Sequence, residues 1–141
     1  MLTKFAVTNY RGFNKRIEWD LSHPANYEFN KSVIKDGIIK NGIIYGPNGS
    51  GKTNFSLAIF DIENHLSQKW KKIDYYINFV YAGNNNRVVK FEYTFKFDND
   101  IIDYLYAKNA AGVLVEESLF VNRMNVFERK DNLFRIDKQQ F

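Results

Sequence analysis

An α/β fold is predicted by three features of the sequence. A short apolar run, Ile43–Tyr45, leads into a glycine-rich octapeptide, and an amphipathic helical pattern follows directly from Thr53. After about residue 74, apolar and polar residues alternate, which is typical of strands with one buried face. These features predict a mixed sheet, one main helix and an antiparallel β-meander. At 141 residues we expect a single domain, 1–141, with the strand pair, loop and helix in 1–74 and the meander in 75–141.

Composition excludes several classes of function. The chain has no Cys, which rules out disulfides, thiol catalysis and cysteine-based zinc sites. No apolar run approaches the roughly 18 residues of a membrane span, and the N-terminus lacks the apolar core of a signal peptide. We therefore expect a cytoplasmic protein that does not enter a membrane. The net charge of +4 favours solubility or, alternatively, contact with nucleic acid.

The N-terminal part predicts two strands and a connection. Residues 2–7 and 16–21 have strand patterns, and a turn at 11–14 joins them. Residues 22–41 are rich in Asn, Lys and turn formers, so we expect a loop-rich connection with at most a short helix. The run Ile43–Tyr45 is short, rich in β-formers and bounded by glycines, which predicts a buried central strand.

The helical pattern places apolar residues at steps of three and four over four to five turns. Its predicted buried face consists of Phe55, Ala58, Ile59, Ile62, Leu66 and Trp70. The segment Leu57–Glu63 superficially resembles a strand that ends in acidic residues, but it lies inside this helix. We therefore expect Asp61 and Glu63 to face solvent.

The second half predicts a meander of three or four strands. Phe91, Tyr93, Phe95 and Phe97 alternate with polar residues, and turn signals occur at 83–86, 98–100 and 109–112. A shorter hairpin is predicted near Phe127 and Phe134. The acidic neighbours Glu116 and Glu117 would lie on opposite faces of a strand, so they cannot act as a carboxylate pair.

The octapeptide Gly46–Thr53 matches the phosphate-binding pattern G-x-x-x-x-G-K-[ST] in full. Glycines allow backbone N–H groups to point at phosphate oxygens, and a helix N-terminus favours an anion. Lys52 is expected to reach the β- and γ-phosphates, and the Thr53 hydroxyl to ligate Mg²⁺. The sequence therefore predicts a nucleotide-binding loop.

Three segments resemble one group of proteins. The loop, with Asn48-Gly49 at its centre, is similar to that of ABC-type ATPases and their SMC and RecF relatives. Residues 5–13 resemble the N-[FY]-[RK]-x-[FL] opening of their first strand. Residues 54–62 resemble the helix after the loop in a bacterial, SMC-like group of AAA-family ATP-binding proteins, some of which act in phage defence. The resemblance implies the N-terminal nucleotide-binding lobe of a P-loop NTPase with an ABC/SMC-like head.

The resemblance also implies particular ligands, partners and binding residues. It implies binding of ATP and Mg²⁺ and a metal contact from Thr53. It also implies a head-to-head partner, either a second ATPase lobe or a second protomer, and an associated nuclease or toxin effector. For Arg11 the alternative is a solvated turn arginine. The implied nucleotide-binding residues are Gly46, Pro47, Asn48, Gly49, Ser50, Gly51, Lys52, Thr53, Asn54 and Arg11.

Several parts of such an ATPase are not found in the sequence. These are the apolar strand that ends in Asp-Glu, the Leu-Ser-Gly-Gly signature and a switch histidine, because His23 and His65 have contexts more typical of structural or exposed residues. Gln139 or Gln140 could serve as the Mg²⁺-sensing glutamine. We expect nucleotide binding without hydrolysis unless a missing lobe, truncated or encoded apart, supplies these parts. Whether the chain is itself an enzyme stays open.

Two other functions are considered. A non-catalytic module for nucleic acid or an effector protein is suggested by basic residues in two regions: Lys69, Lys71, Lys72, Arg123, Arg129 and Lys130. A salt-dependent interaction with nucleic acid would favour it. A small kinase or GTPase is disfavoured, because no guanine-reading N-K-x-D motif and no substrate lid are present.

Overall fold

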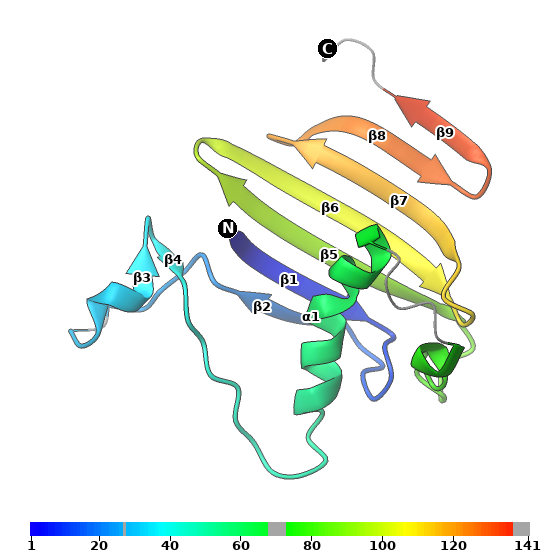
Figure 1. Ribbon diagram of the computed structural model, residues 1–141, viewed down its shortest axis with the longest axis horizontal. Coiled ribbons are helices and arrows are strands. Elements are labelled where there is room, and N and C mark those ends of the chain that lie inside the picture. Colours follow the sequence, from blue (N-terminus) through cyan, green and yellow to red (C-terminus); the bar gives the residue numbers. More distant parts are fainter. Residues whose placement is uncertain (27, 68–72, 137–141) are drawn as a thin grey trace.

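In the computed structural model, which describes residues 1–26, 28–67 and 73–136, the fold is built on one seven-stranded sheet. The strand order is β2-β1-β5-β6-β7-β8-β9, and every pairing is antiparallel (Figure 1). The strands are β1 Leu2–Thr8, β2 Ile17–Asp20, β5 Val88–Phe97, β6 Asp100–Asn109, β7 Leu114–Val121, β8 Met124–Lys130 and β9 Leu133–Ile136.

The general α/β class is confirmed, but the expectation of a mixed sheet is wrong for the described residues. A parallel pair needs a crossover connection of a dozen or more residues between neighbouring strands. Here the five strands β5–β9 follow one another through tight turns, which produce antiparallel pairs. The predicted meander is confirmed as β5, β6 and β7, and the predicted hairpin, β8–β9, extends the same sheet.

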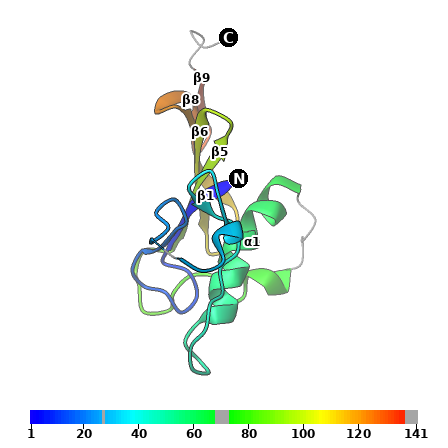
Figure 2. The ribbon, with the colours of Figure 1, turned by 90° about the vertical axis from the view of Figure 1, so that its left-hand side faces the viewer.

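One main helix, α1 Lys52–Ser67, packs on one face of the sheet, as Figure 2 shows with the sheet nearly edge-on. Its position follows from the alternation in the strands, because the aromatic residues of β5 and β6 share the face beneath it. The core beneath α1 is formed mainly by aromatic side chains, among them Phe5, Tyr10, Phe91, Tyr93 and Tyr106. The predicted helix is therefore confirmed.

The buried face of α1 agrees with the prediction in part. Ala58 is buried, and Phe55, Ile59 and Ile62 are partly buried against the core, as expected. Leu66 is exposed instead, and Trp70 lies outside the described residues. Glu63 is exposed, as predicted, but Asp61 is buried, and so is Asn64. Two polar residues thus share the buried side of the helix, where Asp61 contacts Lys108 and Asn64 donates to Tyr76 Oη.

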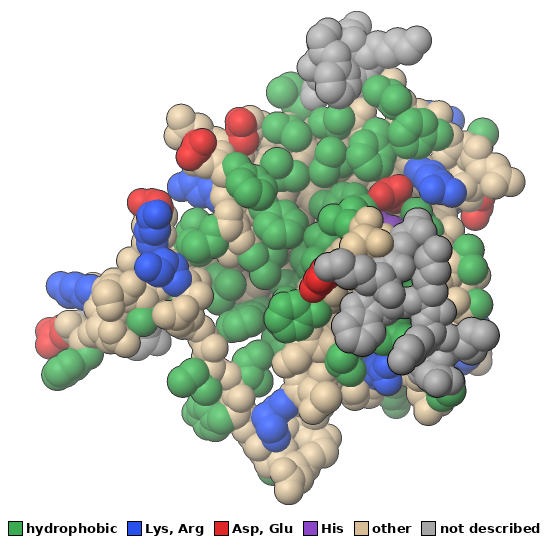
Figure 3. Space-filling view, in the orientation of Figure 1, with side chains coloured by type: hydrophobic (Ala, Val, Ile, Leu, Met, Phe, Trp, Pro, Cys, Tyr) green, Lys and Arg blue, Asp and Glu red, His purple; other side chains and the backbone are tan. Residues whose placement is uncertain are grey.

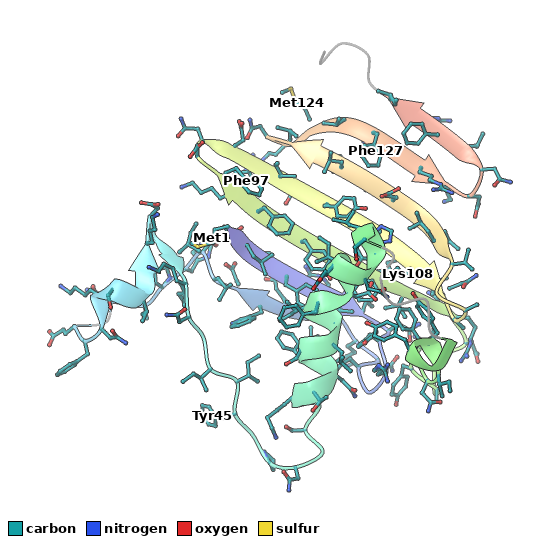
Figure 4. The ribbon with its side chains drawn as sticks, in the orientation of Figure 1. Met1, Tyr45, Phe97, Lys108, Met124 and Phe127 are labelled. Atoms are coloured by element: carbon teal, nitrogen blue, oxygen red, sulfur yellow. The ribbon has the colours of Figure 1, made fainter. Side chains whose placement is uncertain are left out.

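The segment between β2 and α1 differs most from the prediction. Residues 22–41 hold a short 3₁₀ helix, η1 Lys31–Val33, and a small hairpin of β3 Ile34–Lys35 and β4 Ile38–Ile39. The predicted central strand Ile43–Tyr45 is absent, because the segment lies in an extended loop with Ile43 90% and Tyr45 91% exposed (Figure 4).

Ile43–Tyr45 does not form a strand because it has no partner strand among the described residues. A strand is held by backbone hydrogen bonds to its neighbours and by burial of its side chains. Among the described residues, no backbone hydrogen bond joins 41–46 to a strand. The residues of Ile43–Tyr45 suit a strand, but in the described part of the chain this segment pairs with no strand of the sheet.

Candidate functional site

The phosphate-loop sequence forms an exposed turn at the N-terminal end of α1. The Ser50 N–H donates to the Pro47 carbonyl at 3.3 Å, and α1 begins at Lys52. Gly49 and Gly51 have φ values of 80° and 93°, a region that L side chains rarely adopt. The glycines at these two positions therefore allow the loop to turn directly into the helix.

Lys52 folds back over this loop. Its Nζ donates to the carbonyl oxygens of Gly46 and Pro47, at 2.7 and 2.8 Å. The ammonium group is thus held at the mouth of the loop by two neutral acceptors. An anionic phosphate is a stronger acceptor for an ammonium than a carbonyl is, so it can replace either contact. Thr53 lies exposed in the first turn of α1, next to Lys52.

The turn that follows β1 packs directly against the loop. A Cβ added to Gly51 would lie 2.8 Å from the Phe13 ring, and one added to Gly12 would lie 3.5 Å from Asn54 Nδ2. The backbone of the loop and the Phe13 ring are therefore in close contact. Three segments that carried the family resemblance in the sequence, 5–13, the loop Gly46–Thr53 and 54–62, meet at this point.

Arg11 belongs to the same turn, but its guanidinium points to another part of the molecule. Its Nε donates to Tyr10 Oη at 3.0 Å, and a terminal nitrogen donates to the Tyr75 carbonyl at 2.9 Å. The charge also lies over both tyrosine rings, at 5.5 and 5.8 Å from their centroids. Arg11 is half-buried, so it is not a solvated turn arginine. Its contact with a nucleotide stays a prediction.

A cavity of about 460 Å³ opens beside the loop. Its lining comes from the loop and the segment before it, from the turn that follows β1, from β2 at the edge of the sheet, and from the start of α1. Most of its side chains are apolar or aromatic: Phe13, Ile17, Trp19, Ile44, Tyr45 and Phe55. Glu18 also lines the cavity, but it pairs with Lys4 at 3.4 Å and with Arg16 at 2.6 Å.

A buried ionic cluster beneath α1 was not predicted from the sequence. Asp61 is fully buried, and its carboxylate pairs with Lys108 Nζ of β6 at 2.6 Å. Tyr106 Oη donates to the same carboxylate at 2.8 Å and Tyr75 Oη at 3.1 Å. Burial lowers the pKa of Lys108 and raises those of Tyr75 and Tyr106. The prediction that Asp61 faces solvent is therefore wrong, because four polar groups satisfy one another away from water.

His65 extends this cluster towards β7. Its Nε2 lies 2.9 Å from Tyr104 Oη and 3.6 Å from a Glu117 oxygen, while its ring stacks on Tyr106 at 4.1 Å. Tyr104 Oη in turn donates to Glu117. Burial, and secondly the charge of Lys108, lowers the pKa of His65, whereas Glu117 and Asp61 act in the opposite direction. His65 is structural here, as its context in the sequence suggested.

One signal in the sequence could have revealed the cluster. Lys108 follows Tyr104 and Tyr106 at every second position of β6, so the period of the strand places it on the buried face. A lysine at such a position needs an acidic partner. Asp61, the acid nearest the middle of the only long helical pattern, is the partner that an α/β arrangement brings above it.

Of the basic residues proposed to contact nucleic acid, the three that the structure describes, Arg123, Arg129 and Lys130, do not form a continuous stripe. Lys130 pairs with Glu116 at 3.4 Å, Arg129 lies across from Glu117 in the β7–β8 register, and Arg123 is in the turn between these strands. Lys69, Lys71 and Lys72 lie outside the described residues, as do Gln139 and Gln140. The nucleic-acid interaction therefore stays a prediction.

Metal-ligating clusters and membrane-spanning helices are absent from the part of the chain that the structure describes. Among the described residues, no group of three His, Cys, Asp or Glu side chains is placed to hold a metal ion. A site of that kind differs from the expected Mg²⁺ site, in which Thr53 and phosphate oxygens would be ligands. In the same part of the chain, no helix has the length and apolar character needed to cross a membrane.

Comparison with known proteins gives no family assignment. No protein-family model matches the sequence, and no curated protein matches it significantly.

Proposed function

We propose that this chain is the Mg·ATP-binding lobe of an ABC/SMC-like ATPase. The observation that carries the proposal is the complete G-x-x-x-x-G-K-[ST] sequence at the start of a 16-residue helix. The position matters because the helix N-terminus supplies free N–H groups and the positive end of the helix dipole, both of which favour phosphate.

The donor set fits a nucleoside triphosphate. Lys52 would neutralise charge on the β- and γ-phosphates, and Thr53 would hold a Mg²⁺ ion that bridges phosphate oxygens. The Lys52 ammonium already lies over the loop, bound to the carbonyls of Gly46 and Pro47. Exchange of these neutral acceptors for phosphate requires movement of a side chain rather than refolding of the loop.

The cavity beside the loop supports a nucleotide rather than inorganic phosphate. Its volume of about 460 Å³ is within the range of pockets that hold small molecules. Phe13, Trp19 and Tyr45 provide aromatic surface on which a base can be buried or stacked. A polyphosphate on the loop and a base in this cavity would occupy adjoining surfaces.

Titration with a fluorescent ATP analogue in the presence of Mg²⁺ tests the proposal. We expect saturable binding by the wild-type chain and displacement of the analogue by excess unlabelled ATP. Lys52→Ala removes a charge-assisted contact of about 1.5–3 kcal/mol, so we expect it to weaken binding by about tenfold or more.

Lys31→Ala is the matched control, because Lys31 is an exposed lysine in η1 and is absent from the cavity lining. It should bind as the wild type does. Equal affinity of the wild type and Lys52→Ala, or failure of ATP to displace the analogue, would contradict nucleotide binding at this loop.

A further inference from the structure

The face of the sheet that carries α1 continues well beyond the helix. Tyr93 marks the covered part, because its hydroxyl donates to the Ala58 carbonyl of α1 at 2.9 Å. Phe95 and Phe97 follow on the same face of β5, with successive ring centroids 6.2 and 6.1 Å apart. Across the sheet, this face continues through apolar side chains of β6 to β9. We define the open apolar face by six of them: Phe97, Ile102, Val121, Met124, Phe127 and Ile136.

No helix or strand of the described chain covers this face. Figure 1 shows β5–β9 extending past α1, and the edge-on view in Figure 2 shows the same strands without a second layer there. Hydrophobic side chains are gathered over these strands in Figure 3, and Figure 4 places Phe97, Met124 and Phe127 away from the helix. Phe97 and Met124 are each 54% exposed.

The total surface of the chain exceeds that of a compact monomer of the same mass. A compact monomer of 16.6 kDa is expected to expose about 7,600 Å². The chain exposes 9995 Å², about a third more. The excess of roughly 2,400 Å² is about three times the area that each partner buries in a standard protein–protein interface. Because the excess also includes the exposed loop around Ile43 and Tyr45, it is an upper limit on the area that the open apolar face can bury.

The charge pattern limits what the partner can be. The opposite face of the sheet is lined with ion pairs, including Lys4–Glu18 at 3.4 Å and Arg16–Glu92 at 2.9 Å. The six residues of the open apolar face are all uncharged, and their neighbours Phe95 and Leu119 are apolar too. Charged residues lie only at its margins, with Asp100 opposite Phe97 and Arg129 two residues beyond Phe127. One acid and one base at the margins form no basic stripe for a nucleic acid. The open apolar face complements another uncharged apolar surface.

We propose that the open apolar face is a self-association surface, on which two copies of the chain pack sheet against sheet about a twofold axis. A second copy carries the same uncharged surface, and a twofold interface requires a patch that complements itself. Facing sheets pack about 10 Å apart with interdigitated side chains, which suits the large side chains at Phe97, Met124 and Phe127. The contact involves neither the phosphate loop nor a nucleotide, so it is independent of the proposed function.

Sedimentation velocity of the nucleotide-free chain, over concentrations from about 1 to 100 µM, tests this inference. We expect a dimer that dissociates on dilution. The double variant Phe97→Glu/Met124→Glu places a charge in the apolar contact of each partner, so we expect the dissociation constant to rise by about 100-fold or more. Both side chains are half-exposed in the single chain, so the fold should be retained, and far-UV circular dichroism with thermal unfolding verifies this.

Leu133→Glu is the matched control. Leu133 is 67% exposed, lies in the edge strand β9 and alternates with Phe134, so it is on the opposite face of the sheet. The control should dimerise as the wild type does. A wild-type chain that is monomeric throughout, or a double variant with wild-type affinity, overturns the proposal. Equal weakening by Leu133→Glu also overturns it, because the contact would then involve the sheet edge rather than the face.

Discussion

Asp61 and Lys108 form an ion pair in which both side chains are almost completely removed from water. The side chains are 0% and 3% exposed, and the two charged atoms are 2.6 Å apart. Removing two charges from water costs several kcal/mol for each ion, which their attraction offsets only when the remaining lone pairs are also bonded. Tyr75 and Tyr106 supply those bonds. The cluster is tolerated in the core because each of its polar groups has a hydrogen-bond or ion-pair partner within it.

His65 lies at the edge of this cluster and makes the fold sensitive to acid. Glu117 of β7, Lys108, Tyr104 and Tyr106 of β6, and Asp61 of α1 surround it. Because burial holds its pKa below the ordinary 6.5, the unfolded chain binds the proton more readily than the folded chain. The free energy of unfolding contributed by neutral His65 is fully present above about pH 7.5 and is lost as the pH falls through 6.5 towards the folded pKa.

Urea denaturation at several values between about pH 5 and pH 7.5 measures this dependence. We expect His65→Gln to have a flatter profile than the wild type, because the amide can contact Tyr104 but does not titrate. His23→Gln is the comparison variant, since the His23 side chain is 82% exposed and lies outside the cluster. Parallel profiles for the wild type and His65→Gln would show that His65 does not carry the pH dependence.

At the scale of secondary-structure elements, the sequence predicted those whose local pattern agrees with their burial. The meander was predictable because Phe91 to Phe97 alternate over a long strand, and α1 because its apolar period extends over several turns. The loop conformation of Ile43–Tyr45 was not predictable, because pairing with distant strands decides whether a short apolar run joins a sheet. The Asp61–Lys108 contact joins residues 47 positions apart, which a pattern within one helix cannot reveal.

This contact is also a buried ion pair between α1 and the sheet. Lys108→Ala would leave the Asp61 charge buried without its partner, so we expect the free energy of unfolding to fall by about 3–5 kcal/mol. The double variant Asp61→Leu/Lys108→Met removes both charges. Its loss in the free energy of unfolding should be clearly smaller than the sum of the losses in Asp61→Leu and Lys108→Met. Urea denaturation of the wild type, these two single variants and the double variant gives the coupling free energy.

The exposed pair Lys130–Glu116 provides the control for this cycle. Its side chains are 67% and 44% exposed, so Lys130→Ala should change the free energy of unfolding by no more than about 0.5 kcal/mol. If Lys108→Ala lowered the free energy of unfolding as little as Lys130→Ala does, the buried pair would not hold α1 on the sheet. Additive losses in the double variant would lead to the same conclusion.

For the whole molecule, the described residues combine a loop of the G-x-x-x-x-G-K-[ST] pattern with a sheet that has one half-covered apolar face. The loop and the cavity lie at one end of α1, and the open apolar face lies beyond the other end (Figure 4). Sequence analysis predicted the loop residues and their helix, since the motif is local. It did not predict the open apolar face, because exposure depends on how many layers the whole chain provides.

The proposed site should bind Mg·ATP without hydrolysing it in the isolated chain. Hydrolysis needs a carboxylate or similar group that orients the attacking water near the γ-phosphate. Glu18 is the acidic side chain in the described lining of the cavity, and Lys4 and Arg16 already hold it. In a phosphate-release assay with Mg·ATP, we expect the wild-type rate to equal that of Lys52→Ala at every protein concentration at which the analogue binds. Hydrolysis by the wild type that is lost in Glu18→Gln would contradict this prediction and would identify Glu18 as the group that activates water.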